Sequence, residues 1–112
     1  MGESKNVKII VFVPLAYADT VREAMGSAGA GKIGDYSFCS FSSKGIGRFM
    51  PQKGTHPTIG AAGRLESVEE ERIEMICPRE TLLHVIETMK KAHPYEEVAF
   101  DVYPLEDASE KS

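Results

Sequence analysis

The stretch VKIIVFV, Val7–Val13, decides the fold of this chain. Its residues are β-branched or aromatic apart from Lys8, a composition that is typical of a β-strand. Beyond Lys8 the stretch is apolar at odd and even positions alike, so both faces of the strand must be covered. A strand of this kind lies in the middle of its sheet, and Pro14 ends it.

Two helices are predicted, one on each side of the middle of the sequence. Apolar residues recur at three- and four-residue steps over 16–28 and again over 78–92, which is the pattern of amphipathic helices. Gly29 follows the first helix at the position where glycine commonly ends one. His93-Pro94 ends the second.

Three further strands are predicted from alternating residues, over 36–41, 64–77 and 97–103. The charged run Glu69–Arg72 is expected to be a solvated strand end. Between the second and third strands, Ser42–Gly45 is expected to bend the chain, 46–50 to continue as an arm or hairpin, and the Pro- and Gly-rich stretch 51–63 to form a long loop.

The predicted order is therefore βαββαβ. It favours an α+β, ferredoxin-like domain over residues 7–105, with a four-stranded antiparallel sheet and both helices on one face. Residues 1–6 and 106–112 are expected to be disordered ends. Because the helices cover only one sheet face and Val7–Val13 is apolar on both, we expect another copy of the chain to cover the second face, which predicts a homo-oligomer.

Composition excludes several classes of function. The chain has 112 residues, 42% hydrophobic and 27% charged, which suits one soluble domain. Its net charge of −4 and the lack of a basic run make nucleic acid an unsuitable partner. No apolar run is long enough to span a bilayer, so no membrane partner is expected. Cys39 and Cys77 stand alone, which fits a reducing, cytoplasmic location.

The stretch Gly29–Gly34 matches G-x-G-x-x-G, the letters of a dinucleotide-binding motif. That motif must follow a strand and open a helix, whereas this one follows a helix and is expected to enter a strand. A helix stop with a tight turn is therefore the favoured interpretation. Successive glycine N–H groups can still form an anion nest, which Lys32 would assist.

A second cluster, His93-Pro94-Tyr95-Glu96-Glu97, follows the second helix. Its imidazole and carboxylates could bind a divalent metal ion, the one cofactor that the residues suggest. His93 and Glu97 need a third ligand, for which His56 in the long loop is the candidate. The alternative is a Pro-terminated helix end with solvated carboxylates. Cys39 lies among aromatic residues and is more typical of a small core residue than of a nucleophile.

The sequence resembles a known family in the stretches Gly29–Phe49, Pro57–Gly60 and His93–Tyr103. They look like the YqfO insert domain of the Nif-three-like proteins, which are dinuclear-metal, hexameric and often labelled GTP cyclohydrolase type 2 homologues. The likeness runs from about Val7 to Leu105 and implies a stand-alone version of that domain. It also implies a CutA- and PII-like fold that assembles as a trimer. In the full-length family the dinuclear site is built by the flanking domains, so none of its residues can be carried over.

The favoured function is a non-catalytic regulatory or binding module that holds a small ligand or metal ion in clefts between subunits. The candidate ligand-binding residues are Gly31, Lys32, Gly34, Cys39 and Tyr95, and the candidate metal ligands are His56, His93 and Glu97. Two alternatives stay open. One is a metal-dependent hydrolase of nucleotide-like substrates, and the other is a subunit that caps a metal-containing partner.

Overall fold

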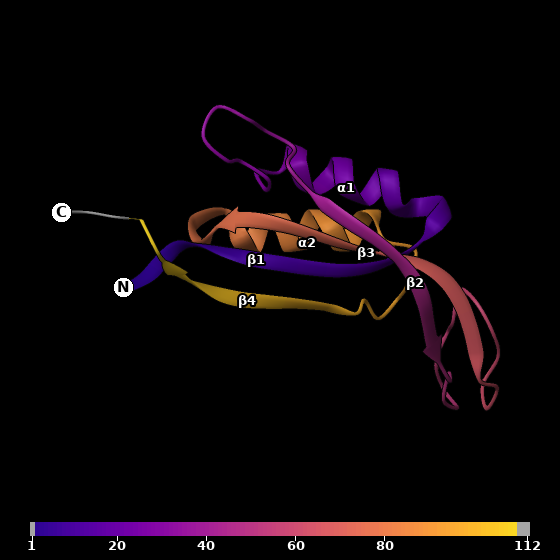
Figure 1. Ribbon diagram of the computed structural model, residues 1–112. Helices are drawn as coiled ribbons and strands as arrows, with labels where there is room; N and C mark the ends of the chain where they lie inside the picture. The colour runs from indigo at the N-terminus through magenta and orange to yellow at the C-terminus, as the bar shows by residue number, and fades with distance from the viewer. Residues whose placement is uncertain (1, 110–112) are drawn as a thin grey trace.

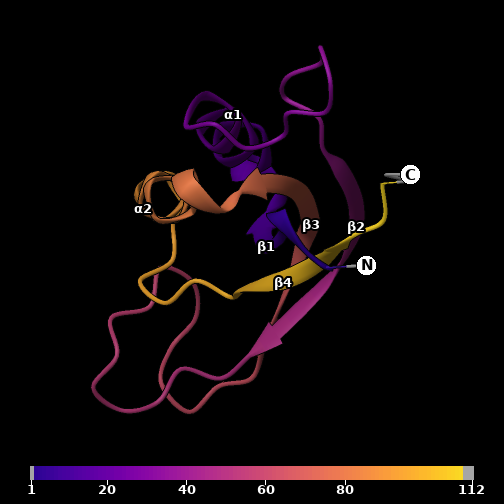
Figure 2. The same cartoon turned by 90° about the vertical axis from the view of Figure 1, so that its left-hand side faces the viewer.

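The computed structural model describes residues 2–109 and confirms the predicted ferredoxin-like fold. Four antiparallel strands form one sheet in the order β2-β3-β1-β4, so the first and third strands are central, as in the expected topology. Both helices lie on one face of the sheet (Figures 1 and 2). The elements are β1 (Gly2–Pro14), α1 (Ala18–Ser27), β2 (Phe41–Phe49), β3 (Glu66–Pro78), α2 (Leu82–Ala92) and β4 (Phe100–Asp107), with short 3-10 turns at Leu15–Tyr17 and Arg79–Thr81.

β1 forms the centre of the core because its odd-numbered side chains from Val7 to Val13 lie beneath the helices. They pack in one cluster with side chains of α1, α2 and β3, namely Val7, Ile9, Val11, Val13, Val21, Met25, Ile73, Met75, Cys77, Val85 and Met89. Each fully buried aliphatic side chain contributes about 1.5–3 kcal/mol. Ile10 is also buried, on the face away from the helices, which is why this strand is apolar at odd and even positions.

The first and last strands, β1 and β4, extend further toward the chain ends than the sequence predicts. β1 begins at Gly2, inside the segment 1–6 that was expected to be disordered, because Gly2 and Glu3 pair with Asp107 and Glu106. β4 likewise ends at Asp107, two residues beyond the expected domain end. Met1 and residues 110–112 of the expected ends lie outside the described part of the chain.

The predicted strand over 36–41 is wrong. Residues 30–40 form an irregular turn, and β2 begins at Phe41 and runs straight through Ser42–Gly45, where a bend was expected. Phe38 has a positive φ of 58°, which a strand cannot accommodate, and Gly26 leaves the space that its ring fills. Packing against α1 therefore overrides the β propensity of these aromatic residues.

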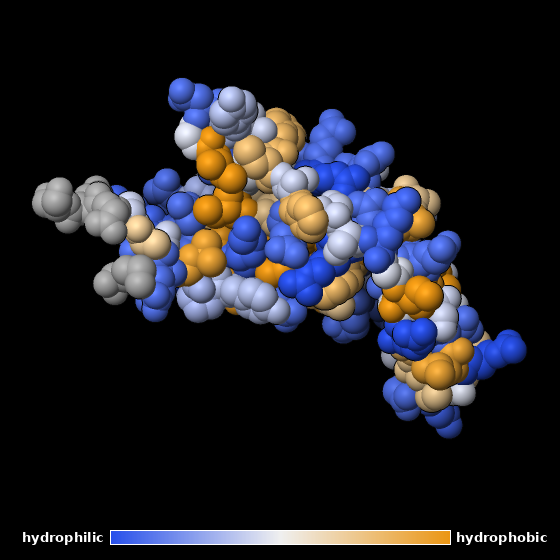
Figure 3. Space-filling view, in the orientation of Figure 1, coloured by the Kyte–Doolittle hydropathy of each residue, from blue (hydrophilic) through white to orange (hydrophobic). Residues whose placement is uncertain are grey.

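The far ends of β2 and β3 project from the body of the molecule as an arm, here defined as residues 44–71, which includes the loop 50–65 (Figure 1). Exposed apolar side chains gather in two places, near residues 30–41 and on this arm (Figure 3). In the first place they are Ile33, Tyr36, Phe38 and Phe41, and in the second Ile46, Met50 and Leu65.

The sheet face away from the helices carries both apolar and charged side chains. Phe12 is half-buried there beside Ile10, and the Arg72 guanidinium lies 5.9 Å from the centre of the Phe12 ring. Register places Glu74 and Asp101 on either side of Ile10. None of the helices in residues 2–109 has the length and hydrophobicity needed to cross a membrane.

Candidate functional site

The structure separates the two groups of residues predicted to bind a ligand. The Gly31 N–H donates to the Ile76 carbonyl oxygen (2.7 Å), whereas Tyr95 donates through its hydroxyl to Glu70 (3.3 Å). Ile76 and Glu70 are both on β3, six residues apart, which corresponds to about 20 Å along a strand. Within one chain, therefore, the glycine turn and the His93–Glu97 cluster do not meet.

Two backbone N–H groups of the glycine turn already donate to carbonyl oxygens of the same chain. The Gly29 N–H donates to Gly26 and the Gly31 N–H to Ile76, while the Cys39 N–H donates to the Gly31 carbonyl (2.8 Å). The first two of these N–H groups are thus not directed toward an anion. Lys32 and Gly34 are exposed and Cys39 is partly exposed. Gly29, with a φ of +119°, takes the helix-ending position that was predicted.

His93 connects α2 to β1. Its side chain is 6% exposed, its Nδ1 accepts the Tyr95 N–H (3.1 Å) and its Nε2 lies 2.7 Å from the Phe12 carbonyl oxygen. Since Nδ1 is an acceptor, Nε2 must carry the proton and donate to Phe12, which defines a neutral imidazole. Burial lowers the pKa of His93, although the bond to Phe12 opposes the shift. Both ring nitrogens are used within the chain.

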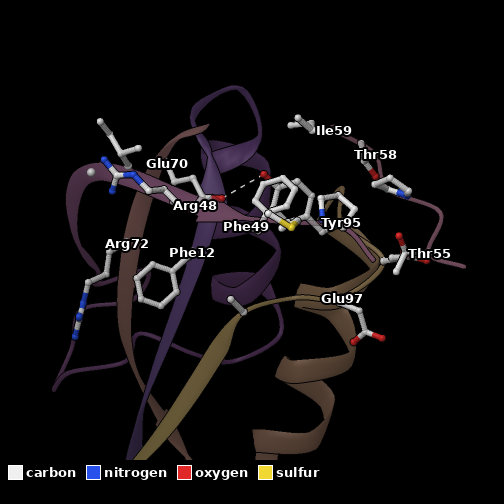
Figure 4. A pocket seen from close by; sticks show the side chains of 18 of the residues that line it. Phe12, Arg48, Phe49, Thr55, Thr58, Ile59, Glu70, Arg72, Tyr95 and Glu97 are labelled. Atoms are coloured by element: carbon white, nitrogen blue, oxygen red, sulfur yellow. Dashed lines mark hydrogen bonds between the residues drawn. The ribbon is translucent and has the colours of Figure 1, made fainter. Parts of the chain in front are cut away.

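The three predicted metal ligands are not brought together. His56 contacts the cluster through its backbone, where its N–H donates to Glu96 Oε1 (2.8 Å), and the Thr58 hydroxyl donates to the Pro94 carbonyl oxygen (2.6 Å). The Glu97 carboxylate points away from Tyr95 (Figure 4). Within the described residues, no group of three or more His, Cys, Asp or Glu side chains is placed to hold a metal ion.

The loop contacts close one side of a pocket of about 590 Å³ on the arm (Figure 4). Its walls come from β2, the loop 50–65, the Tyr95–Ala99 segment and the helix-free face of β1 and β3. Its apolar lining residues include Phe12, Ile46, Phe49, Met50, Pro57 and Ile59, and its polar ones Lys44, Arg48, Glu70, Arg72, Tyr95 and Glu97. Of the predicted site residues, only Tyr95 and Glu97 line it.

Glu70 is a lining residue whose burial the sequence did not reveal. It is 8% exposed, although the charged run Glu69–Arg72 was expected to be solvated. Burial raises the pKa of Glu70, which the hydrogen bond from Tyr95 partly offsets. Burial and the neighbouring Glu70 raise the pKa of Tyr95 to about 12. The Tyr95 ring in turn lies 5.7 Å from that of Phe49, centre to centre.

A signal for the burial of Glu70 does exist in the partner strand. Register places Gly45 directly opposite Glu70, and a Cβ at the neighbouring Gly47 would overlap the Glu70 carboxyl group. Two glycines in a strand indicate a close approach to its surface. The sequence pattern alone does not say which residue makes that approach.

Replacing Glu70 by glutamine is expected to stabilise the protein by about 1 kcal/mol at pH 7, because this buried carboxylate forms no ion pair with a cation of residues 2–109 and such a charge is costly. The amide keeps the shape and can still accept from Tyr95. Since the folded pKa is raised above the ordinary 4.5, this cost appears above that pH and grows as the pH rises through the folded pKa. The increase in the free energy of unfolding caused by Glu70→Gln should therefore be smaller at acidic pH. Urea unfolding at several pH values measures it.

Glu69→Gln is the matched control, since Glu69 is exposed and lies on the opposite face of the same strand. Its free energy of unfolding should stay within about 0.5 kcal/mol of the original. A Glu70→Gln protein less stable than the original at pH 7 would contradict the assignment of Glu70 as a costly buried acid.

Comparison with known proteins places these features in a longer sequence. No family model matches the chain. It is 53% identical over 103 residues to the GTP cyclohydrolase 1 type 2 homolog of Halalkalibacterium halodurans, covering 92% of this chain and 28% of the relative. It is 54% identical over 99 residues to the protein of the same name from Bacillus subtilis, covering 88% and 26%. The chain thus spans little more than a quarter of the relatives it matches.

Solved structures agree with this match. A Bacillus cereus protein related to NIF3 superposes with a TM-score of 0.80 at 53% identity, over 95% of this chain and 26% of that one. The periplasmic divalent cation tolerance protein CutA from Archaeoglobus fulgidus superposes with a TM-score of 0.67 at 16% identity, covering 93% and 87%. GlnK from B. subtilis gives 0.59 at 16% identity, covering 89% and 84%. The last two likenesses concern the fold alone.

Proposed function

We propose that this chain, which is homologous to one segment of the Nif-three-like GTP cyclohydrolase 1 type 2 homologues, is a non-catalytic, oligomeric binding module. Its ligand is a small molecule, and the binding site is the pocket on the arm. The pocket replaces the glycine turn as the favoured site, while Tyr95 is kept from the residues predicted earlier. The cytoplasmic location remains a prediction from the two free cysteines.

The observation that carries this proposal is the pocket in which the buried Glu70 accepts a hydrogen bond from the half-buried Tyr95. Small-molecule sites are typically concave, mostly apolar and about 300–1,000 Å³ in volume, with a few polar groups that fix the orientation of the ligand. The pocket has a suitable volume, apolar walls from two strands and a loop, and a carboxyl group with a raised pKa. A carboxyl group in a cleft whose pKa is raised by burial is a candidate mark of a functional site.

An oligomer is supported by the mixed face of the sheet. Phe41 and Tyr103 are exposed there by 68% and 47%, on the same sheet face as the half-buried Phe12. Interfaces commonly combine such aromatic side chains with charged groups at the rim. We propose the trimer that the family resemblance implies. The hydrolase and capping functions are not favoured by a specific contact in residues 2–109.

Light scattering measures the mass of the assembled protein, which should correspond to three copies of the chain. Ligand binding is tested with a screen of fragments and nucleotides, including GTP, followed by amide NMR on this assembly. Bound compounds are expected to shift the amides of 46–59, Glu70 and 95–99, and not those of Gly31–Cys39. Lys32→Ala should leave the affinity unchanged. Binding that maps to Gly31–Cys39, or no binding at the arm, would overturn the proposed site.

A further inference from the structure

Glu70 is a buried acid without a cation partner among the described residues. Its one hydrogen bond, from the Tyr95 hydroxyl, is long at 3.3 Å. The nearest guanidinium on its strand is engaged elsewhere, because Arg72 pairs with Glu74 (3.1 Å) and lies over the Phe12 ring. Charges buried this deeply are normally paired. The carboxylate therefore has unused capacity to accept hydrogen bonds, and the pocket is the open space in front of it.

The groups around this carboxylate suit a flat cation. Phe49 and Tyr95 lie beside it with their rings inclined at 59°, and Phe12 lines the same pocket from β1 (Figure 4). Aromatic faces attract cations, and planar ones can also stack. A carboxylate pairs with two parallel N–H donors when they lie in one plane, as in amidinium and guanidinium groups. An ammonium group carries the charge but does not have two parallel, coplanar N–H donors.

We propose that the pocket binds a flat organic cation of the amidinium or guanidinium class, with its N–H donors on the Glu70 carboxylate and its plane against the aromatic rings that line the pocket. The inference rests on the proposed function, since it names the ligand class of that same pocket. The cations Lys44 and Arg48 also line the pocket, but they are exposed, so solvent screens their repulsion.

Three compounds of nearly the same shape test the charge requirement: benzamidine, benzamide and benzoate. Benzamidine is expected to bind at least about tenfold more tightly than benzamide, because hydrogen bonds to charged groups contribute about 1.5–3 kcal/mol each. Benzoate should bind least, since it repels Glu70. Affinities come from NMR titration of the amides of Phe49, Glu70 and Tyr95.

Two variants assign the effect to Glu70. In Glu70→Gln the preference for benzamidine over benzamide should disappear, whereas in Tyr95→Phe, which keeps the acid, it should persist. Circular dichroism checks that both variants are folded. The inference is overturned if the original protein binds both compounds equally or not at all, or if the preference survives in Glu70→Gln.

Failure of this inference is distinguishable from failure of the proposed function. Should benzamide or benzoate bind in the pocket better than benzamidine, the site is real and only the ligand class is wrong. If no fragment or nucleotide of any charge shifts the pocket amides, both the site and its ligand class are wrong.

Discussion

Replacing Gly31 by alanine is expected to lower the free energy of unfolding by roughly 3–4 kcal/mol, whereas the same change at Gly34 should cost only about 1 kcal/mol. Both glycines have positive φ, +82° and +56°, so alanine is strained at either position. The difference comes from the surroundings. A Cβ at position 31 would lie 2.7 Å from the Cys39 carbonyl oxygen and 2.8 Å from Met75 Cε, while none of the described atoms lies within 4 Å of one at position 34.

The clash at Gly31 cannot be relieved cheaply because it involves backbone. Pairing of β2 with β3 ends at Phe41 and Glu74, and Gly31 then occupies the open edge of β3 by donating to Ile76. The chain leaves at Gly31, turns, and returns at Cys39, whose N–H donates to the Gly31 carbonyl. Moving either residue breaks one of these bonds. Urea unfolding of the two variants measures the difference, and equal losses would show that φ strain alone decides.

The fold could be predicted from local patterns where they agree with tertiary packing. The two-sided apolarity of Val7–Val13 identified the central strand because burial on both faces leaves no polar position beyond Lys8. The stripe Leu82, Val85, Ile86, Met89 identified the second helix because residues three and four positions apart share the one face that packs on the sheet. At Phe38 the local pattern failed, because its β propensity is weaker than the packing of its ring over Gly26.

The candidate site was harder to predict because it depends on contacts between distant segments. The bond from the Thr58 hydroxyl to the Pro94 carbonyl joins residues that are 36 positions apart. No periodicity encodes such a contact. Glu70 shows the same limit, since a run of charged residues normally marks solvent and only the glycines of the neighbouring strand indicate otherwise. Tyr95 was found because it stands in a compact cluster of polar groups.

Replacing His93 by alanine is expected to destabilise the protein by about 3 kcal/mol at pH 7, through a cavity and two unsatisfied backbone groups. The imidazole joins the Phe12 carbonyl of β1 to the Tyr95 N–H, so its removal also loosens the segment that forms one pocket wall. His84→Gln, on the exposed face of α2, is the control and should change the stability by less than about 0.5 kcal/mol.

Protonation of His93 should also make the free energy of unfolding depend on pH. The unfolded chain protonates this imidazole near its ordinary pKa of 6.5, whereas burial lowers the folded pKa, so between these two values the unfolded state binds more protons. The free energy of unfolding should therefore fall as the pH is lowered from about 6.5 to the folded pKa. Protonation of Nδ1 would also place a donor against the Tyr95 N–H and break that bond. Urea unfolding across this range should show the decrease in the original protein and a smaller one in His93→Ala. The same decrease in both proteins would assign the pH dependence to other groups.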